Sequence, residues 1–162
     1  MFFTRLGMRI NSRPLVGAKD TGREMYKMVE DYYTDMAPWV DLSLLDIFKT
    51  VAELPFNFDP DSEELLKRPF YTMHSIGPGG DCDDKAICIA SWAKLNGYPY
   101  RFVATGRKKP GQSIFSKILL SHVLAQVYIY DNWLICDATY AFNVFGLDLS
   151  FKEYDKIVVL EP

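Results

Sequence analysis

Residues 79–95 read Gly-Gly-Asp-Cys-Asp-Asp-Lys and then Ala-Ile-Cys-Ile-Ala-Ser-Trp-Ala-Lys-Leu. The Gly-Pro-Gly-Gly run that leads into this stretch cannot continue a helix, so a new element begins at Asp81. Aspartate is a favoured N-cap residue, and Asp83 and Asp84 suit the positive end of a helix dipole. An Asn-Gly pair after the apolar run supplies a stop. The pattern predicts one short helix, apolar on nearly every face, with Cys82 in its first turn.

A cysteine at the start of a buried helix is chemically distinctive. The unpaired backbone N–H groups there stabilise a thiolate and can also hold an oxyanion. We therefore interpret Cys82 as a nucleophile. The other two cysteines, Cys88 and Cys136, are interpreted as core residues, because each is expected to point into the fold. Three cysteines without a CxxC pair indicate free thiols in a reducing compartment.

The composition limits the function classes. A chain of 162 residues with 49% hydrophobic residues is expected to be one globular domain, 1–162, with a helical N-terminal part at 1–58 and a core at 59–162. A net charge of −3 gives no reason to expect nucleic-acid binding. The N-terminus is interrupted by arginines and predicts no signal peptide, and no run is long enough to cross a bilayer. We expect a cytoplasmic protein, or one within a particle assembled in the cytoplasm.

The N-terminal half is predicted to be helical. Residues 1–17 form an extended or irregular lead-in, and helical spacing of apolar residues predicts helices at 21–36 and 41–54, the second capped by Asp41 or Ser43. The acidic stretch 59–64 is interpreted as a capped turn that opens a short helix through Leu66. A calcium loop is disfavoured, because the central glycine and the bidentate glutamate are lacking.

The second half is predicted to be a sheet. Period-two patterns predict strands at 100–105, 121–130, 133–139 and 156–160, with a tight turn at Asp131-Asn132. The basic loop 107–112 is interpreted as a surface turn rather than a phosphate site. Helices followed by antiparallel strands indicate an α+β domain.

Cys82, His122 and Asp137 are the residue types that thiol catalysis needs, and they stand at the ends of elements. A regular hairpin with its turn at Asp131-Asn132 sets His122 and Asp137 about four residues apart along the strands, or about 13 Å. On this register alone the two side chains are too far apart to meet, unless a bulge or a different turn brings them together.

These blocks resemble the transglutaminase-like superfamily. The similarity lies in Gly-Asp-Cys-Asp-Asp-Lys-Ala before the apolar helix, in residues 97–103, in Ser121-His122-Val123, and in Trp133 followed by Asp137-Ala138-Thr139. It runs from about residue 59 to residue 140, in the order Cys, His, Asp. The resemblance implies a papain-like fold in which a helix that bears the nucleophile packs on an antiparallel sheet that bears the other two residues. It also implies that the two strand residues meet.

The resemblance implies a role for each residue. Cys82 would be the nucleophile, His122 would exchange the proton, and Asp137 would orient the imidazolium. The backbone N–H of Cys82 is the natural oxyanion donor, and His74 is a candidate side-chain donor on chemistry alone. A zinc site made by the same three residues is the less favoured alternative. Asp83 and Asp84 are interpreted as dipole acids, and Trp92 and Trp133 as core residues.

The leading hypothesis is a thiol-dependent amide-bond hydrolase or acyl transferase that works through an acyl-thioester, without a cofactor or a metal. Its expected partner is a protein or peptide substrate, with no nucleic acid and no membrane. The alternative is a catalytically weak or inactive module with a structural or binding role. The resemblance extends to short bacterial and phage proteins, which implies a processing or virion-associated role among other proteins of an assembly.

Overall fold

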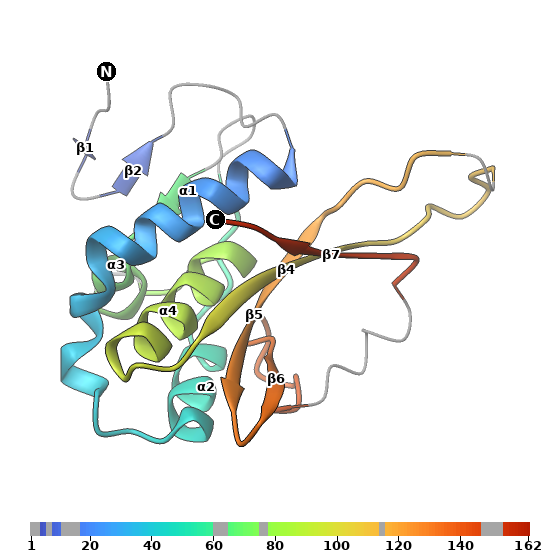
Figure 1. Ribbon diagram of the computed structural model, residues 1–162. Helices are drawn as coiled ribbons and strands as arrows, with labels where there is room; N and C mark the ends of the chain where they lie inside the picture. Colours follow the sequence, from blue (N-terminus) through green and yellow to red (C-terminus); the bar gives the residue numbers. More distant parts are fainter. Residues whose placement is uncertain are drawn as a thin grey trace.

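The computed structural model describes residues 4–5, 8–10, 17–59, 65–74, 78–113, 116–146 and 154–162. Its helical elements are α1 (Ala18–Tyr32), the 3-10 helix η1 (Tyr33–Trp39), α2 (Leu44–Ala52), α3 (Pro69–His74) and α4 (Cys82–Leu95). Its strands are β1 (Thr4–Arg5), β2 (Met8–Ile10), β3 (Leu65–Lys67), β4 (Tyr100–Gly106), β5 (His122–Ile129), β6 (Asn132–Cys136) and β7 (Lys156–Leu160). The helices come first and pack on an antiparallel sheet, so the predicted α+β class is confirmed (Figure 1).

Helix α4 is the centre of the molecule. All of its residues from Asp83 to Ala93 are buried, as the apolar run predicts. It contacts β5 on one side and α1, η1, α2 and α3 on the others. Gly97, with φ +75°, ends it at the predicted Asn-Gly pair. A helix buried on every side holds its first turn in a fixed position, which is what a reactive group at Cys82 requires.

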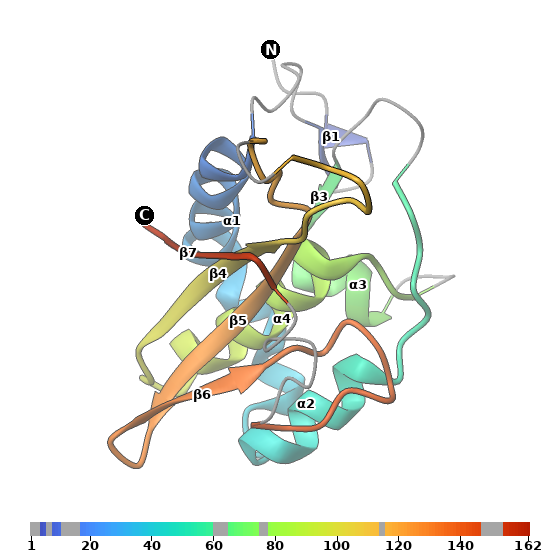
Figure 2. The same cartoon turned by 90° about the vertical axis from the view of Figure 1, so that its right-hand side faces the viewer.

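The larger sheet has the order β6-β5-β4-β7, with every neighbouring pair antiparallel. Its inner face packs on α4 and, at β7, on α1. The inward residues alternate along the strands, as period two requires. These residues are Phe102, Ala104, Val123, Ala125, Val127, Cys136 and Leu160. In Figure 2 the sheet lies in front of α4, and the segment after β6 runs beside α2, where Phe145 packs on Phe48 at 5.4 Å between ring centroids.

The hairpin between β5 and β6 turns one residue earlier than predicted. Ile129 pairs with Asn132, so the turn residues are Tyr130 and Asp131, with φ of 52° and 59°. Two successive positive φ values are typical of the turn that matches strand twist. If the observed pairing is continued by one residue past Cys136, Asp137 lies opposite Leu124, two residues from His122 along β5. The predicted turn would have made this offset four residues. The remaining offset of about 7 Å lies within reach of the two side chains.

The N-terminal helices follow the predicted apolar spacing with shifted ends. In α1, Met25, Met28 and Val29 are fully buried. The chain then tightens into η1 instead of continuing as an α-helix to residue 36. Ser43, one of the two predicted caps, begins α2, and its hydroxyl accepts a hydrogen bond from the backbone N–H of Asp46 at 3.1 Å.

Short elements account for the other differences. Leu66 lies in β3 rather than at the end of a helix, because β3 pairs with β2 inside the extended lead-in. Helix α3 was not predicted. Residues 61–64 of the acidic stretch lie outside the described residues. Trp133 is half-buried rather than in the core, since its ring faces outward under the Arg101 guanidinium at 4.2 Å.

No helix among the described residues combines the length and the apolar character needed to span a membrane.

Candidate active site

The loop that places Cys82 depends on two glycines. A Cβ on Gly79, whose φ is +113°, would lie 2.2 Å from the Pro55 carbonyl oxygen. A Cβ on Gly80 would lie 2.3 Å from Oδ2 of Asp84. Only glycine therefore permits this packing. The loop before α4 therefore packs closely against Pro55 and Asp84. Cys82, which follows this loop, is half-buried.

His122 and Asp137 meet at the opposite edge of the site. His122 begins β5, Asp137 directly follows β6, and Nε2 of the imidazole lies 2.9 Å from Oδ2 of the carboxylate. The other carboxylate oxygen accepts a hydrogen bond from the backbone N–H of Thr139 at 3.2 Å. The side chains are 17% and 4% exposed, so water screens this pair weakly. The structure brings together the two residues that a regular hairpin with the predicted turn would separate.

The electrostatics of His122 favour its charged form. Burial by itself lowers the pKa of His122, but its interactions with Asp137 and Cys82 outweigh burial and raise the pKa to about 11. Burial likewise opposes ionisation of Asp137, yet its hydrogen bonds with His122 and Thr139 lower its pKa. The arrangement therefore stabilises an imidazolium held by a carboxylate.

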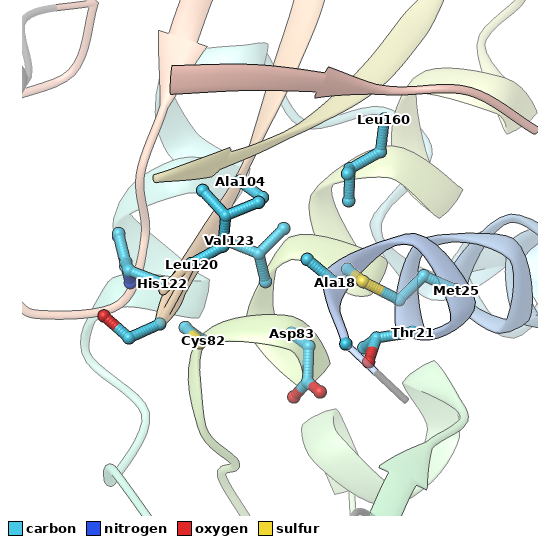
Figure 3. A pocket seen from close by; sticks show the side chains of 12 residues that line it. Ala18, Thr21, Met25, Cys82, Asp83, Ala104, Leu120, His122, Val123 and Leu160 are labelled. Carbon is cyan, nitrogen blue, oxygen red and sulfur yellow. The ribbon is translucent and has the colours of Figure 1, made fainter. Parts of the chain in front are cut away.

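The third residue lies on the other side of the imidazole. Asp137 occupies Nε2, which leaves Nδ1 as the ring nitrogen for the thiol. Cys82 and His122 both line one pocket, where their side chains lie near each other (Figure 3). A thiol, an imidazole and a carboxylate in this order can form a thiolate–imidazolium pair.

A buried lysine, Lys85, links α4 to the segments that follow α2 and β6. The sequence pattern did not indicate this role. Lys85 is 1% exposed, and its ammonium donates to the carbonyl oxygens of Leu54 at 2.7 Å and Thr139 at 2.9 Å. A third carbonyl oxygen, that of Ala52, lies at 3.5 Å. Burial lowers the pKa of Lys85, while the charge of Asp137 acts in the opposite direction. The sequence does indicate that this lysine is buried, because it belongs to a helix that is apolar on nearly every face.

Three acids at the start of α4 could offer ligands to a metal ion. One carboxylate oxygen each of Asp81, Asp83 and Asp84 lies within 4.8 Å of the others. Protein groups already bind two of them. Asp84 accepts from the backbone N–H and the ammonium of Lys67 at 2.7 and 2.8 Å, and Asp83 accepts from the Asp84 N–H at 2.8 Å.

Burial affects the protonation of these acids. Burial and the charge of Asp81 raise the pKa of Asp84 to about 7, against the opposing effect of Lys67. Burial, a hydrogen bond with Asp81 and nearby negative charge raise the pKa of Asp83 well above its usual range. Both shifts favour the protonated carboxyl, so burial opposes the ionised form in which an acid stabilises a helix dipole. The role of Asp83 and Asp84 as dipole acids stays a prediction.

The other residues that the sequence indicated make packing contacts. Cys88 and Cys136 are fully buried, and Trp92 is in the core, as predicted. The His74 ring packs on Trp39 at 4.5 Å between ring centroids. The Trp39 carbonyl accepts a hydrogen bond from the indole of Trp92 at 3.1 Å.

A second residue that the sequence did not indicate is Tyr154, whose ring stacks on the His122 imidazole at 6.2 Å. The Arg107 guanidinium lies 5.0 Å from the centroid of the same ring. Because Tyr154 is far from His122 in the chain, no spacing rule could have paired them.

Comparison with known proteins gives two findings. A family model described as the transglutaminase-like superfamily matches residues 45–138. A solved structure of a candidate cysteine protease from Cytophaga hutchinsonii is similar, with 14% identity and a TM-score of 0.46 over 91% of this chain. This chain spans 50% of the length of that protein. A search of curated proteins found no match.

Proposed function

The chain belongs to the transglutaminase-like superfamily, and from this premise we propose that it is a thiol-dependent amide-bond hydrolase or acyl transferase. The observation that carries the proposal is the His122–Asp137 hydrogen bond of 2.9 Å beside Cys82 at the start of α4. In this proposal Cys82 is the nucleophile, His122 the proton carrier and Asp137 the group that orients the imidazole.

The proposed reaction has two halves. The thiol proton passes to His122, the sulfur attacks the carbonyl carbon, and the carbonyl oxygen becomes an oxyanion near the helix start. The C–N bond then breaks as His122 returns the proton to the leaving amine, which leaves a thioester on Cys82. Water or a second amine gives a proton to His122 and attacks the thioester, and the thiol is regenerated. Water yields hydrolysis and an amine yields transfer.

The exposure of Cys82 supports this proposal over a purely structural role. A structural cysteine is usually sealed in the core, as Cys88 and Cys136 are. Cys82 instead lines an open pocket together with His122. Its chemistry is therefore available to a substrate.

The test is the rate of alkylation by iodoacetamide between pH 4 and 9, with labelled sites identified by mass spectrometry. We expect Cys82 to react rapidly at pH 6, where a free thiol with a pKa of about 8.5 is almost entirely protonated. The buried Cys88 and Cys136 should stay unlabelled. The His122→Ala variant should lower the rate at pH 6 at least tenfold, and His74→Ala, which removes the other histidine, should leave it unchanged.

Two results would refute the proposal. One is a pH profile that matches a free thiol and is indifferent to His122. The other is the absence of Cys82 labelling in the folded protein.

A further inference from the structure

A pocket of about 260 Å³ adjoins Cys82 (Figure 3). Five elements build it: α1, the start of α4, and strands β4, β5 and β7 with the residues just before β5. Its apolar side chains are Ala18, Met25, Ala104, Leu120, Val123 and Leu160. Apolar walls favour the burial of apolar groups.

A close contact between α1 and β7 positions the Leu160 side of the pocket. A Cβ on Gly22 would lie 2.9 Å from Cδ1 of Leu160, so no larger residue fits there without a shift. The Tyr26 hydroxyl donates to the Leu160 carbonyl oxygen at 3.0 Å and fixes the same contact. The Leu160 wall is thus held against α1 at two points.

The charge of the pocket restricts what it can bind. Among the described residues that line it, none is a lysine, an arginine or a glutamate. Its one acid, Asp83, is 3% exposed and already accepts a hydrogen bond from the Asp84 N–H. Burial raises the pKa of Asp83 well above its usual range, which favours the protonated carboxyl. Among the described lining residues the one cationic group is the His122 imidazolium, and Asp137 already pairs with it. A charged side chain placed against the apolar walls would find no opposite charge beside it, and its transfer from water would be unfavourable.

The position of the pocket connects it to the reaction. Cys82 and His122 form one of its walls, so a group that enters it lies next to the bond under attack. The acyl group of a thioester would stay joined to Cys82 while its side chain occupied the pocket. This step rests on the proposed function.

We propose that this pocket is the specificity site for an uncharged aliphatic side chain, of about the size of leucine, on the acyl side of the scissile amide. The substrate class is therefore a peptide or protein with an aliphatic residue at that position.

Covalent probes test this without a known substrate. N-acetyl-aminoacyl chloromethyl ketones with glycine, leucine, lysine or glutamate side chains alkylate a thiolate, with a C–S bond formed and chloride released. The readout is the second-order rate of modification of Cys82, measured by intact mass. We expect the leucine probe to react at least tenfold faster than the glycine probe, which is the usual discrimination of an apolar pocket. The lysine and glutamate probes should show no such gain.

A pair of variants on α1 locates the effect. Ala18→Leu places a larger side chain in the pocket and should bring the leucine-to-glycine rate ratio down to about one. Lys19→Leu adds the same side chain at the next, exposed position, which does not line the pocket, and should preserve the ratio.

The inference is overturned if the four probes react at equal rates, if a charged probe reacts fastest, or if Ala18→Leu keeps the ratio. The probe series on the wild-type protein decides the question even if Ala18→Leu does not fold. If iodoacetamide labels Cys82 rapidly in a way that depends on His122, but the four probes react at equal rates, the specificity site is refuted and the proposed function stands. Loss of the iodoacetamide signal would refute the proposed function itself.

Discussion

The ammonium of Lys85 donates a hydrogen bond of 2.9 Å to the carbonyl oxygen of Thr139. Thr139 in turn donates its N–H to the Asp137 carboxylate at 3.2 Å. Lys85 stands three residues after Cys82 on the same helix, so one helix carries both the candidate nucleophile and the clamp on the loop that holds the candidate acid. The geometry of the site thus depends on a residue that touches none of the reacting atoms.

Loss of this clamp should destabilise the fold. Lys85→Met preserves most of the side-chain volume but leaves buried carbonyl oxygens without a donor, so we expect a loss of roughly 2–4 kcal/mol in the free energy of unfolding. Urea denaturation measures it. The control is Lys94→Met in the same helix, which removes a surface pair with Glu30 at 2.7 Å and should cost less than about 1 kcal/mol. Equal losses in the two variants would contradict the clamp.

Removal of the Asp137 charge should change the titration of His122. Asp137→Asn keeps the shape of the side chain but loses the charge that holds the imidazolium, so the pKa of His122 should fall from about 11 toward its ordinary 6.5 or below. NMR titration of the ring protons reads this directly, since the chain has two histidines and exposed His74 serves as the internal reference. An unchanged His122 titration would show that Asp137 does not hold the ring.

The same pair makes the stability depend on pH. The pKa of His122 is raised in the folded protein, so its stabilisation is complete below about pH 6.5 and is lost as the pH rises toward about 11. The pKa of Asp137 is lowered, so its stabilisation is present above about pH 3.8 and is lost in more acidic solution. We expect the stability difference between wild type and His122→Gln to be greatest near pH 4–6.5 and to shrink steadily by pH 10. Urea midpoints at several pH values test this, and a constant difference would argue against the pair.

The loop before Cys82 should not tolerate a side chain at Gly79. Gly79→Ala combines a positive φ with a clash against the Pro55 carbonyl, so we expect a loss of roughly 3 kcal/mol or more, together with slower alkylation of Cys82. Gly111→Ala is the matched control, because its φ is +80° but nothing lies within 4 Å of the added Cβ. Strain alone should cost that variant about 1 kcal/mol. Thermal unfolding of both variants separates the clash from the strain.

The sequence predicted the parts of the fold that depend on local pattern. The run from Gly79 to Leu95 specified a buried helix and both of its ends, because its glycines, acids and apolar residues all favour the same structure. Alternating apolar residues likewise specified β4, β5 and β7 closely. The fold class followed from the order of these elements.

Long-range contacts decided what the sequence did not predict. Tight hairpin turns favour glycine and asparagine, so the sequence indicated a turn that includes Asn132. In the structure Asn132 instead pairs with Ile129, and this strand pairing places Tyr130 in the turn at positive φ. The roles of Lys85 and Tyr154 depend on partners more than 30 residues away. Burial, which no local pattern predicts, also raises the pKa of Asp83.

The contact between Tyr26 and Leu160 joins residues 134 positions apart. Cys82, His122 and Asp137 are all synthesised before β7, whereas the Leu160 wall of the pocket is made only when β7 emerges. A nascent chain on the ribosome would thus carry all three residues before the wall of the proposed specificity pocket is made. In the proposed function, the residues that carry out the reaction thus precede in the chain the strand that completes the recognition pocket.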